Sequence, residues 1–188
     1  MKSVIFTEDS STTAESTEAK QVRNYFWGGF LSVASLEKDL AEYGETEIHI
    51  LSDEYGYLTG SQDSSKITDS PSSGIKSFRE ALHSAVSEAN VIVFLLTKST
   101  FESVVKDSWQ TLSSQARSEI IWCIGVSKSA LSSIDLSKLE QKWLWSTHLR
   151  AGRDSSHWIR NAGESSGAYR IKSVSAEVRR CHRIVLTE

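Results

Sequence analysis

The sequence predicts an α/β protein with an open, mostly parallel five-stranded sheet in three layers, with helices on both faces. Two observations support this prediction. Five short runs rich in apolar and β-branched residues alternate along the chain with segments of helical periodicity. Two of these runs, at 90–97 and 119–126, are almost wholly apolar, as strands covered on both faces are. Strands that alternate with helices favour a parallel, Rossmann-like sheet.

The expected elements follow in order. Thr12 and Glu15 have capping-box spacing and predict a long helix over 13–42, broken or kinked at Gly28-Gly29. The segment 74–89 carries one apolar stripe of helical period. Two further capping-box pairs are Ser99 with Glu102 and Ser137 with Glu140. The five expected strands are 2–7, 46–52, 90–97, 119–126 and 183–188.

Length and composition indicate a single α/β domain over residues 1–188 of ordinary globular composition. The longest apolar run, VIVFLL at 91–96, is too short to span a membrane, and the N-terminus lacks a signal-peptide core. Cys123 and Cys181 are expected as reduced thiols, and no zinc or haem spacing is present. We therefore expect a cytoplasmic protein without a metal or other cofactor, and the sequence leaves its oligomeric state open.

The charge is distributed unevenly along the chain. Residues 1–94 carry seven Lys and Arg against 15 Asp and Glu, a net charge of −8, whereas residues 95–188 carry 14 against nine, a net charge of +5. The imbalance is sharpest in 141–183, which has nine basic and three acidic residues. An acidic and a basic half can form two faces of one domain.

Polar residues follow several of the expected strands. In open α/β sheets, ligands bind beyond the carboxyl ends of the strands. We therefore expect Ser52, Asp53, Glu54 and Tyr55, which follow the second strand, to face Glu8 and Asp9, which follow the first. Crowded carboxylates raise one another's pKa, which suits general acid and base chemistry. The catalytic candidates are Glu8, Asp9, Asp53 and Glu54, and the alternative is that these acids only cap helices and solvate loops.

The same end of the sheet supplies the substrate-binding candidates. Tyr55 and Tyr57 can stack on a base or donate a hydrogen bond, or simply pack at a turn. Gly56 permits a sharp turn or a close approach to a ligand. The amides of Ser99 and Thr100, beside Lys98, can hold a phosphate or only begin a helix. The sequence contains neither a P-loop nor a dinucleotide-binding fingerprint.

A second candidate region interleaves aromatic and basic side chains over 142–180. Cations that meet phosphates, next to aromatic rings that stack on bases, are typical of proteins that bind single strands or flipped bases. The alternative is a solvated basic face with tryptophans in the core. The nucleic-acid-binding candidates are Trp143, Trp145, Arg150, Arg153, Trp158, Arg160 and Arg170.

The residues at 51–57, LSDEYGY, resemble the Leu-Ser-x-x-Tyr-Gly-Leu element of the YaaA-like and DUF6884 group of α/β proteins. The resemblance covers the first half of the chain, and implies a link to DNA damage, modified-base handling and base removal. It carries over Ser52, Tyr55 and Gly56 as a substrate-facing element. The first loop departs from the group, which usually has Cys or Ser followed by Lys or Arg where this chain has TEDSS at 7–11.

These observations together favour an enzyme that acts on nucleic acid or a nucleoside, with hydrolysis of a glycosidic bond as the reaction. A carboxylate at a strand end would stabilise an oxocarbenium-like centre or activate water. The first alternative is a non-catalytic α/β module that binds a nucleotide, a nucleic acid or a protein partner. The second alternative is a small-molecule transferase that uses the same end of the sheet.

Overall fold

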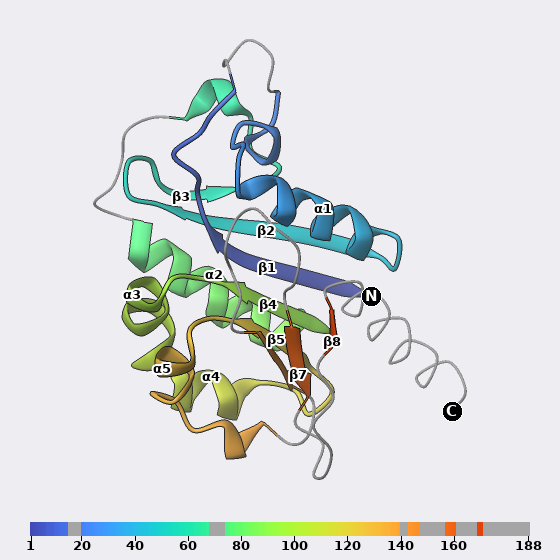
Figure 1. Ribbon diagram of the computed structural model, residues 1–188, viewed down its shortest axis with the longest axis vertical. Helices are drawn as coiled ribbons and strands as arrows, with labels where there is room; N and C mark the ends of the chain where they lie inside the picture. Colours follow the sequence, from blue (N-terminus) through green and yellow to red (C-terminus); the bar gives the residue numbers. More distant parts are fainter. Residues whose placement is uncertain (15–19, 68–73, 140–142, 147–156, 161–168, 171–188) are drawn as a thin grey trace.

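The protein folds around one mixed sheet (Figure 1). The computed structural model describes residues 1–14, 20–67 and 74–139, together with the backbone of three short strands at 143–146, 157–160 and 169–170. The strand order is β3-β2-β1-β4-β5-β6-β7-β8. The strands are β1 (Lys2–Glu8), β2 (Glu45–Ser52), β3 (Gly56–Thr59), β4 (Val91–Leu95), β5 (Ile121–Gly125), β6 (Trp143–Ser146), β7 (His157–Arg160) and β8 (Tyr169–Arg170).

The predicted parallel α/β architecture is confirmed. Strands β2, β1, β4, β5 and β6 pair in parallel, while β3, β7 and β8 are antiparallel additions at the two edges. Four of the five predicted strands correspond to β1, β2, β4 and β5. The fifth parallel strand, β6, was not predicted, and the predicted strand at 183–188 lies outside the described residues.

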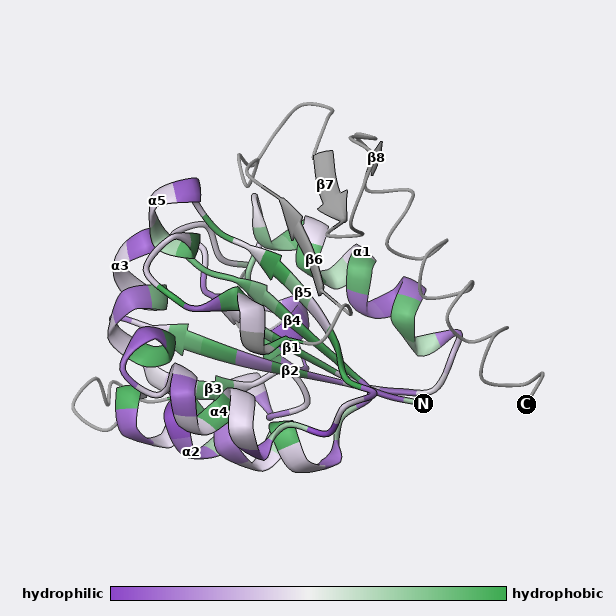
Figure 2. Cartoon of the chain, turned by 90° about the horizontal axis from the view of Figure 1, so that it is seen from below, coloured by the Kyte–Doolittle hydropathy of each residue, from purple (hydrophilic) through white to green (hydrophobic). Residues whose placement is uncertain are grey.

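Helices cover both faces of the sheet, as Figure 2 shows for α1 on one side and for α2 and α4 on the other. The chain moves from β1 to β2 in one direction and from β3 to β4 in the other, so right-handed crossovers place α1 and α2 on opposite faces. The α-helices are α1 (Phe30–Ala41), α2 (Gly74–Glu88), α3 (Lys98–Phe101), α4 (Trp109–Gln115) and α5 (Lys128–Leu131). Short turns are η1 (Val22–Asn24), η2 (Ser64–Lys66), the π-helical η4 (Glu102–Lys106) and η5 (Leu136–Lys138).

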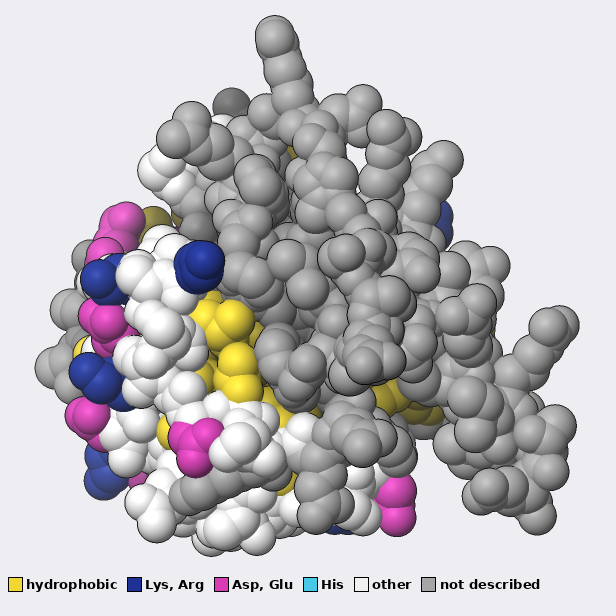
Figure 3. All heavy atoms as spheres, turned by 60° about the horizontal axis from the view of Figure 1, so that its bottom comes forward, with side chains coloured by type: hydrophobic (Ala, Val, Ile, Leu, Met, Phe, Trp, Pro, Cys, Tyr) yellow, Lys and Arg dark blue, Asp and Glu magenta, His cyan; other side chains and the backbone are white. Residues whose placement is uncertain are grey.

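The core has one layer on each face of the sheet, because successive strand residues point to opposite sides. Ile5 and Ile50 pack with Phe30 of α1, whereas Phe6 packs with Phe78 of α2 on the other face. In Figure 2 the central strands are the most hydrophobic part of the chain. Figure 3 shows a strip of hydrophobic side chains on one face, with charged side chains of both signs gathered along one margin.

Within the described residues, the predicted helix over 13–42 is correct only for its last part, α1, and residues 15–19 lie outside them. Before α1 the backbone forms a β-like pairing: the amide of Ala14 donates to the carbonyl of Tyr25 over 2.7 Å, and that of Trp27 donates to the carbonyl of Thr12 over 2.7 Å. Gly28 then adopts a φ of +62°, which an α-helix does not allow. Glu15, the second residue of the predicted capping box, lies outside the described residues.

Both later capping-box predictions also differ from the structure. Thr97 caps α3, because its side-chain oxygen accepts from the amide of Thr100, so the helix begins before Ser99. Asp135 caps the turn η5, and Glu140 lies outside the described residues. The predicted helix at 74–89 is confirmed as α2, although Ile75 at its start is 45% exposed. Within the described residues, no helix has both the length and the apolar character needed to cross a membrane.

Candidate functional site

The carboxyl ends of β1 and β2 bring together the four carboxylates that the sequence singled out. The amide of Asp9, just after β1, donates to the carbonyl of Leu51 near the end of β2 over 3.3 Å. Asp53 and Glu54 occupy the turn that follows β2, and together with Glu8 they act electrostatically on Asp9. We call Glu8, Asp9, Asp53 and Glu54 the acid rim.

The turn after β2 is built by Ser52 and Gly56. Ser52 is 3% exposed, and its oxygen accepts from the amides of Glu54 over 3.2 Å and Tyr55 over 3.0 Å. Its hydroxyl also hydrogen-bonds the Asp9 carboxylate, so one buried side chain connects the two loops. Gly56 has a φ of +73°, as expected of a glycine that closes a three-residue hairpin loop into β3.

The carboxyl of Asp9 is partly buried, unlike those of Asp53 and Glu54. Burial raises the pKa of the Asp9 carboxyl, and the negative charges of Asp53, Glu8 and Glu54 raise it further, while the Ser52 hydrogen bond opposes them. The side chains of Asp53 and Glu54 are exposed. The site therefore contains one partly buried carboxyl with an elevated pKa beside two exposed carboxylates, a combination that can exchange a proton and stabilise positive charge.

The carboxylate of Glu8 binds a residue that follows the neighbouring strand, β4. Its two carboxylate oxygens accept from the amide of Thr97 over 3.1 Å and from the hydroxyl of Thr97 over 2.8 Å. Thr97 lies between β4 and α3, so this carboxylate spans the junction of β1 and β4 where the strand order reverses direction. Two acids of the rim therefore bind neighbouring segments: Glu8 binds Thr97, and Asp9 binds Ser52.

Tyr55 connects the acid rim to a residue that the sequence analysis did not identify. Its phenol hydrogen-bonds with Tyr25 and with Glu54, and these contacts together with desolvation raise the pKa of Tyr55 well above its usual value. The rings of Tyr25 and Tyr55 meet edge to face, with centroids 6.4 Å apart. Both contacts favour the protonated phenol, as expected when a hydroxyl donates to its neighbours. No local pattern reveals Tyr25, because the contact is made by tertiary folding.

Tyr57, on β3, contacts His49 on the neighbouring strand β2. Its hydroxyl lies 2.6 Å from His49 Nδ1, and the two rings are stacked with centroids 5.8 Å apart. Desolvation, with the charge of Glu47, raises the pKa of Tyr57 to about 12. The substrate-binding role predicted for Tyr57 stays a prediction, and its contacts with His49 are internal to the protein.

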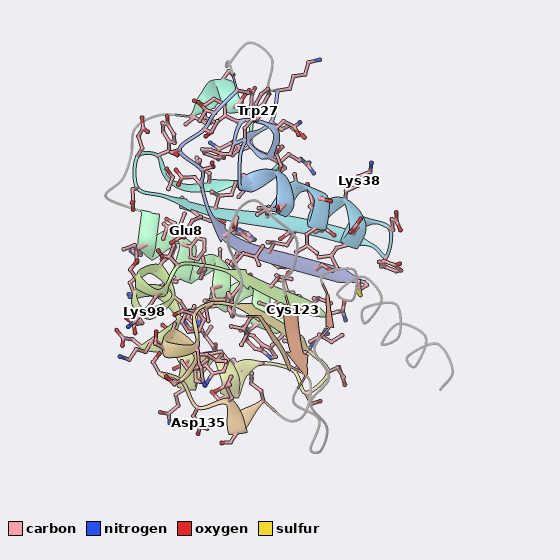
Figure 4. All side chains as sticks on the ribbon, viewed as in Figure 1. Glu8, Trp27, Lys38, Lys98, Cys123 and Asp135 are labelled. Carbon is pink, nitrogen blue, oxygen red and sulfur yellow. The ribbon has the colours of Figure 1, made fainter. Side chains whose placement is uncertain are left out.

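The three residues predicted to hold a phosphate lie at the start of α3. Lys98 is 3.9 Å from Glu102, one turn further on, and Figure 4 shows Lys98 on the same side of the molecule as Glu8. The amide of Thr100 faces the hydroxyl oxygen of Thr97 at 3.4 Å. Ser99 Oγ lies 3.1 Å from the same oxygen. These polar groups are therefore organised around Thr97 and, through it, around Glu8.

The predicted nucleic-acid-binding residues fall in the last three strands and the segments between them. Trp143 and Trp145 belong to β6, Trp158 and Arg160 to β7, and Arg170 to β8, while Arg150 and Arg153 lie outside the described residues. Because β6 is parallel to β5, it ends at the same edge of the sheet as the strands that carry the acid rim. The binding role of this region stays a prediction.

No group of three or more His, Cys, Asp or Glu side chains in the described part of the chain is arranged to hold a metal ion. No protein-family model, curated protein or solved structure matches this chain. Its function has to be inferred from the site itself.

Proposed function

We propose that this protein is an enzyme that hydrolyses a glycosidic bond between a base and its sugar in nucleic acid or a nucleoside. The observation that supports this proposal is the environment of Asp9, a partly buried carboxyl that lies among three other acids at the carboxyl ends of parallel strands. Enzymes that break glycosidic bonds commonly need one carboxyl that exchanges a proton and negative charge beside the sugar.

Asp9 is the proposed general base. Its elevated pKa brings it closer to neutral pH, where a base is most effective. Asp9 takes a proton from water as the water oxygen bonds to the anomeric carbon of the sugar. The bond between that carbon and the nitrogen of the nucleobase breaks, and its electron pair moves to the nucleobase. The proton held by Asp9 then passes to the departing base. The exposed carboxylates of Asp53 and Glu54 stabilise the positive charge that develops on the sugar.

Two other groups are assigned to positioning. Tyr55 orients the base, because its ring adjoins the acid rim and its hydroxyl is held by Glu54. The basic and tryptophan-rich chain from β6 onward holds the strand in nucleic-acid substrates, since β6 ends at the same edge of the sheet.

The alternative, a non-catalytic binding module, is favoured by a different observation. Ser52 and Glu8 both make hydrogen bonds that organise turns, as acids and hydroxyls do in purely structural roles. Asp9 separates the two proposals, because only the enzyme needs a carboxyl that exchanges a proton.

To test the proposal, the protein is incubated with a panel of nucleosides and oligonucleotides that includes modified bases. Chromatography then measures the amount of free base released. We expect Asp9→Asn to lower turnover by about 10²- to 10⁴-fold, the usual contribution of a general base. It should melt at the same or a higher temperature at pH 7, because an ionised, partly buried carboxylate disfavours folding. Asp39→Asn, on the exposed side of α1, serves as the control and should keep full activity. Unchanged turnover in Asp9→Asn would contradict the proposal.

A further inference from the structure

At the junction between β1 and β4, a carboxylate of the chain itself binds the residue that precedes α3. In open α/β sheets this reversal point is where ligands bind, and the loop that starts the next helix often meets their phosphates. Here the amide and the hydroxyl of Thr97 are both taken by the carboxylate of Glu8, over 3.1 and 2.8 Å. The chain's own carboxylate therefore occupies the donors that a ligand anion would need.

The neighbouring polar groups of this exposed turn contact one another. The hydroxyl oxygen of Thr97 lies 3.1 Å from Ser99 Oγ and 3.2 Å from Thr100 Oγ1, and it accepts from the amide of Thr100. Lys98 lies 3.9 Å from the carboxylate of Glu102. The hydroxyls of this turn are therefore engaged with Thr97, and the Lys98 side chain is 53% exposed.

The charge next to this junction is negative. Glu8 acts on Asp9 together with Asp53 and Glu54, so a phosphate that approached the acid rim would meet four carboxyl groups. Like charges brought together at a binding site repel and disfavour the ligand that carries them. Uncharged groups, such as a base or the hydroxyls of a sugar, do not incur this repulsion.

We infer that Glu8 is a specificity-determining residue that excludes phosphate groups from the junction of β1 and β4, so that the site accepts the uncharged base and sugar of a nucleoside and rejects a 5′-nucleotide. The substrate class rests on the proposed function, whereas the role of Glu8 in excluding phosphate rests on its hydrogen bonds to Thr97. In a nucleic-acid substrate, the flanking phosphates have to be bound outside this junction.

Inorganic phosphate tests the exclusion without any catalytic assay. Thermal unfolding is measured in phosphate and in sodium chloride of equal ionic strength for the wild type, Glu8→Ala, Glu8→Gln and Thr97→Val. Thr97→Val is the matched control, because it removes a Glu8 hydrogen bond but keeps the negative charge. The general effect of phosphate on hydration is common to all four proteins and cancels in the comparison.

We expect phosphate to raise the melting temperature of Glu8→Ala and Glu8→Gln by a few degrees more than that of the wild type or Thr97→Val. Titration with adenosine 5′-monophosphate should show the same order, with at least about tenfold tighter binding to Glu8→Ala than to the wild type. Equal responses in all four proteins, or stronger phosphate binding by the wild type, would overturn the inference. Release of base from nucleosides is measured separately, so its failure would overturn the proposed function and leave the phosphate result intact.

Discussion

At the scale of single residues, burial and hydrogen bonding distinguish four acids that look equivalent in the sequence. Glu8 holds Thr97 across the sheet, and Asp9 is partly buried against Ser52. Asp53 and Glu54 are exposed on the turn. The position of these acids at strand ends follows from the sequence pattern, but their individual environments depend on contacts with residues far away in the chain, such as Thr97. The sequence could therefore predict the cluster and not the division of roles.

His49 supplies a pH-dependent test at the same scale. Desolvation lowers the pKa of His49, which is stacked on Phe6 with centroids 4.9 Å apart and hydrogen-bonded to Tyr57. Lys2 lowers this pKa further, while Glu47 raises it. The unfolded chain takes up a proton more readily than the folded protein, so the stability that neutral His49 provides is complete above about pH 6.5 and is lost as the pH falls toward the lowered pKa.

We expect the free energy of unfolding in urea to fall between pH 7 and pH 5 by on the order of 1 kcal/mol more in the wild type than in a His49→Phe/Tyr57→Phe double variant. The double variant keeps the two stacked rings and leaves no phenol without its partner. Tyr57→Phe alone serves as the control and should keep the pH dependence. Parallel pH profiles for the wild type and the double variant would contradict this assignment.

At the scale of elements, the sequence patterns that predicted secondary structure correctly belong to segments that pack against one another. The apolar runs of β4 and β5 became buried strands and the stripe of α2 became the buried face of a helix, because each could cover the other. The short strand β3 was missed, since its four residues form a strand only when Gly56 turns the chain back onto β2. Strands β6 to β8 were missed because their aromatic and basic composition suggested a binding surface rather than a sheet edge.

Two glycines fix how α2 meets the turn that carries the acid rim. A methyl group on Gly74, the first residue of α2, would lie 2.8 Å from the Cα of Gly56 and 3.2 Å from Leu51 Cδ1. The nearest atom belongs to the backbone and cannot rotate away. We expect Gly74→Ala to lower the free energy of unfolding by about 1–3 kcal/mol, the usual effect of overpacking.

Chemical denaturation in urea measures this effect, with Lys76→Ala as the control on the same turn of α2. Lys76 is exposed and makes only a 3.9 Å surface ion pair with Glu80, so its removal should cost no more than about 0.5 kcal/mol. A Gly74→Ala protein as stable as the control would show that the two glycines are not in close contact.

At the scale of the whole molecule, the strand order separates the acidic half of the sequence from its basic half across the sheet. The acid rim lies at the carboxyl ends of β1 and β2, whereas β6, which begins the basic region, lies on the other side of β4 and β5. Neighbouring strands are about 4.8 Å apart, so the three steps from β1 to β6 separate the two regions by roughly 14 Å. Under the proposed function, a base would reach the acids while the phosphates of its strand meet basic side chains.

This arrangement predicts salt-sensitive binding of single-stranded DNA or RNA, measured by tryptophan fluorescence in a Trp27→Phe background that removes the exposed Trp27 of the acidic half. An Arg150→Ala/Arg153→Ala variant should bind more weakly and show a shallower dependence of affinity on salt, by about one unit in slope for each phosphate that the protein no longer neutralises. Lys38→Ala, on α1 in the acidic half (Figure 4), should bind as the parent protein does. If the two variants are weakened equally, the attraction comes from net charge alone, and the basic region has no specific role in holding the strand.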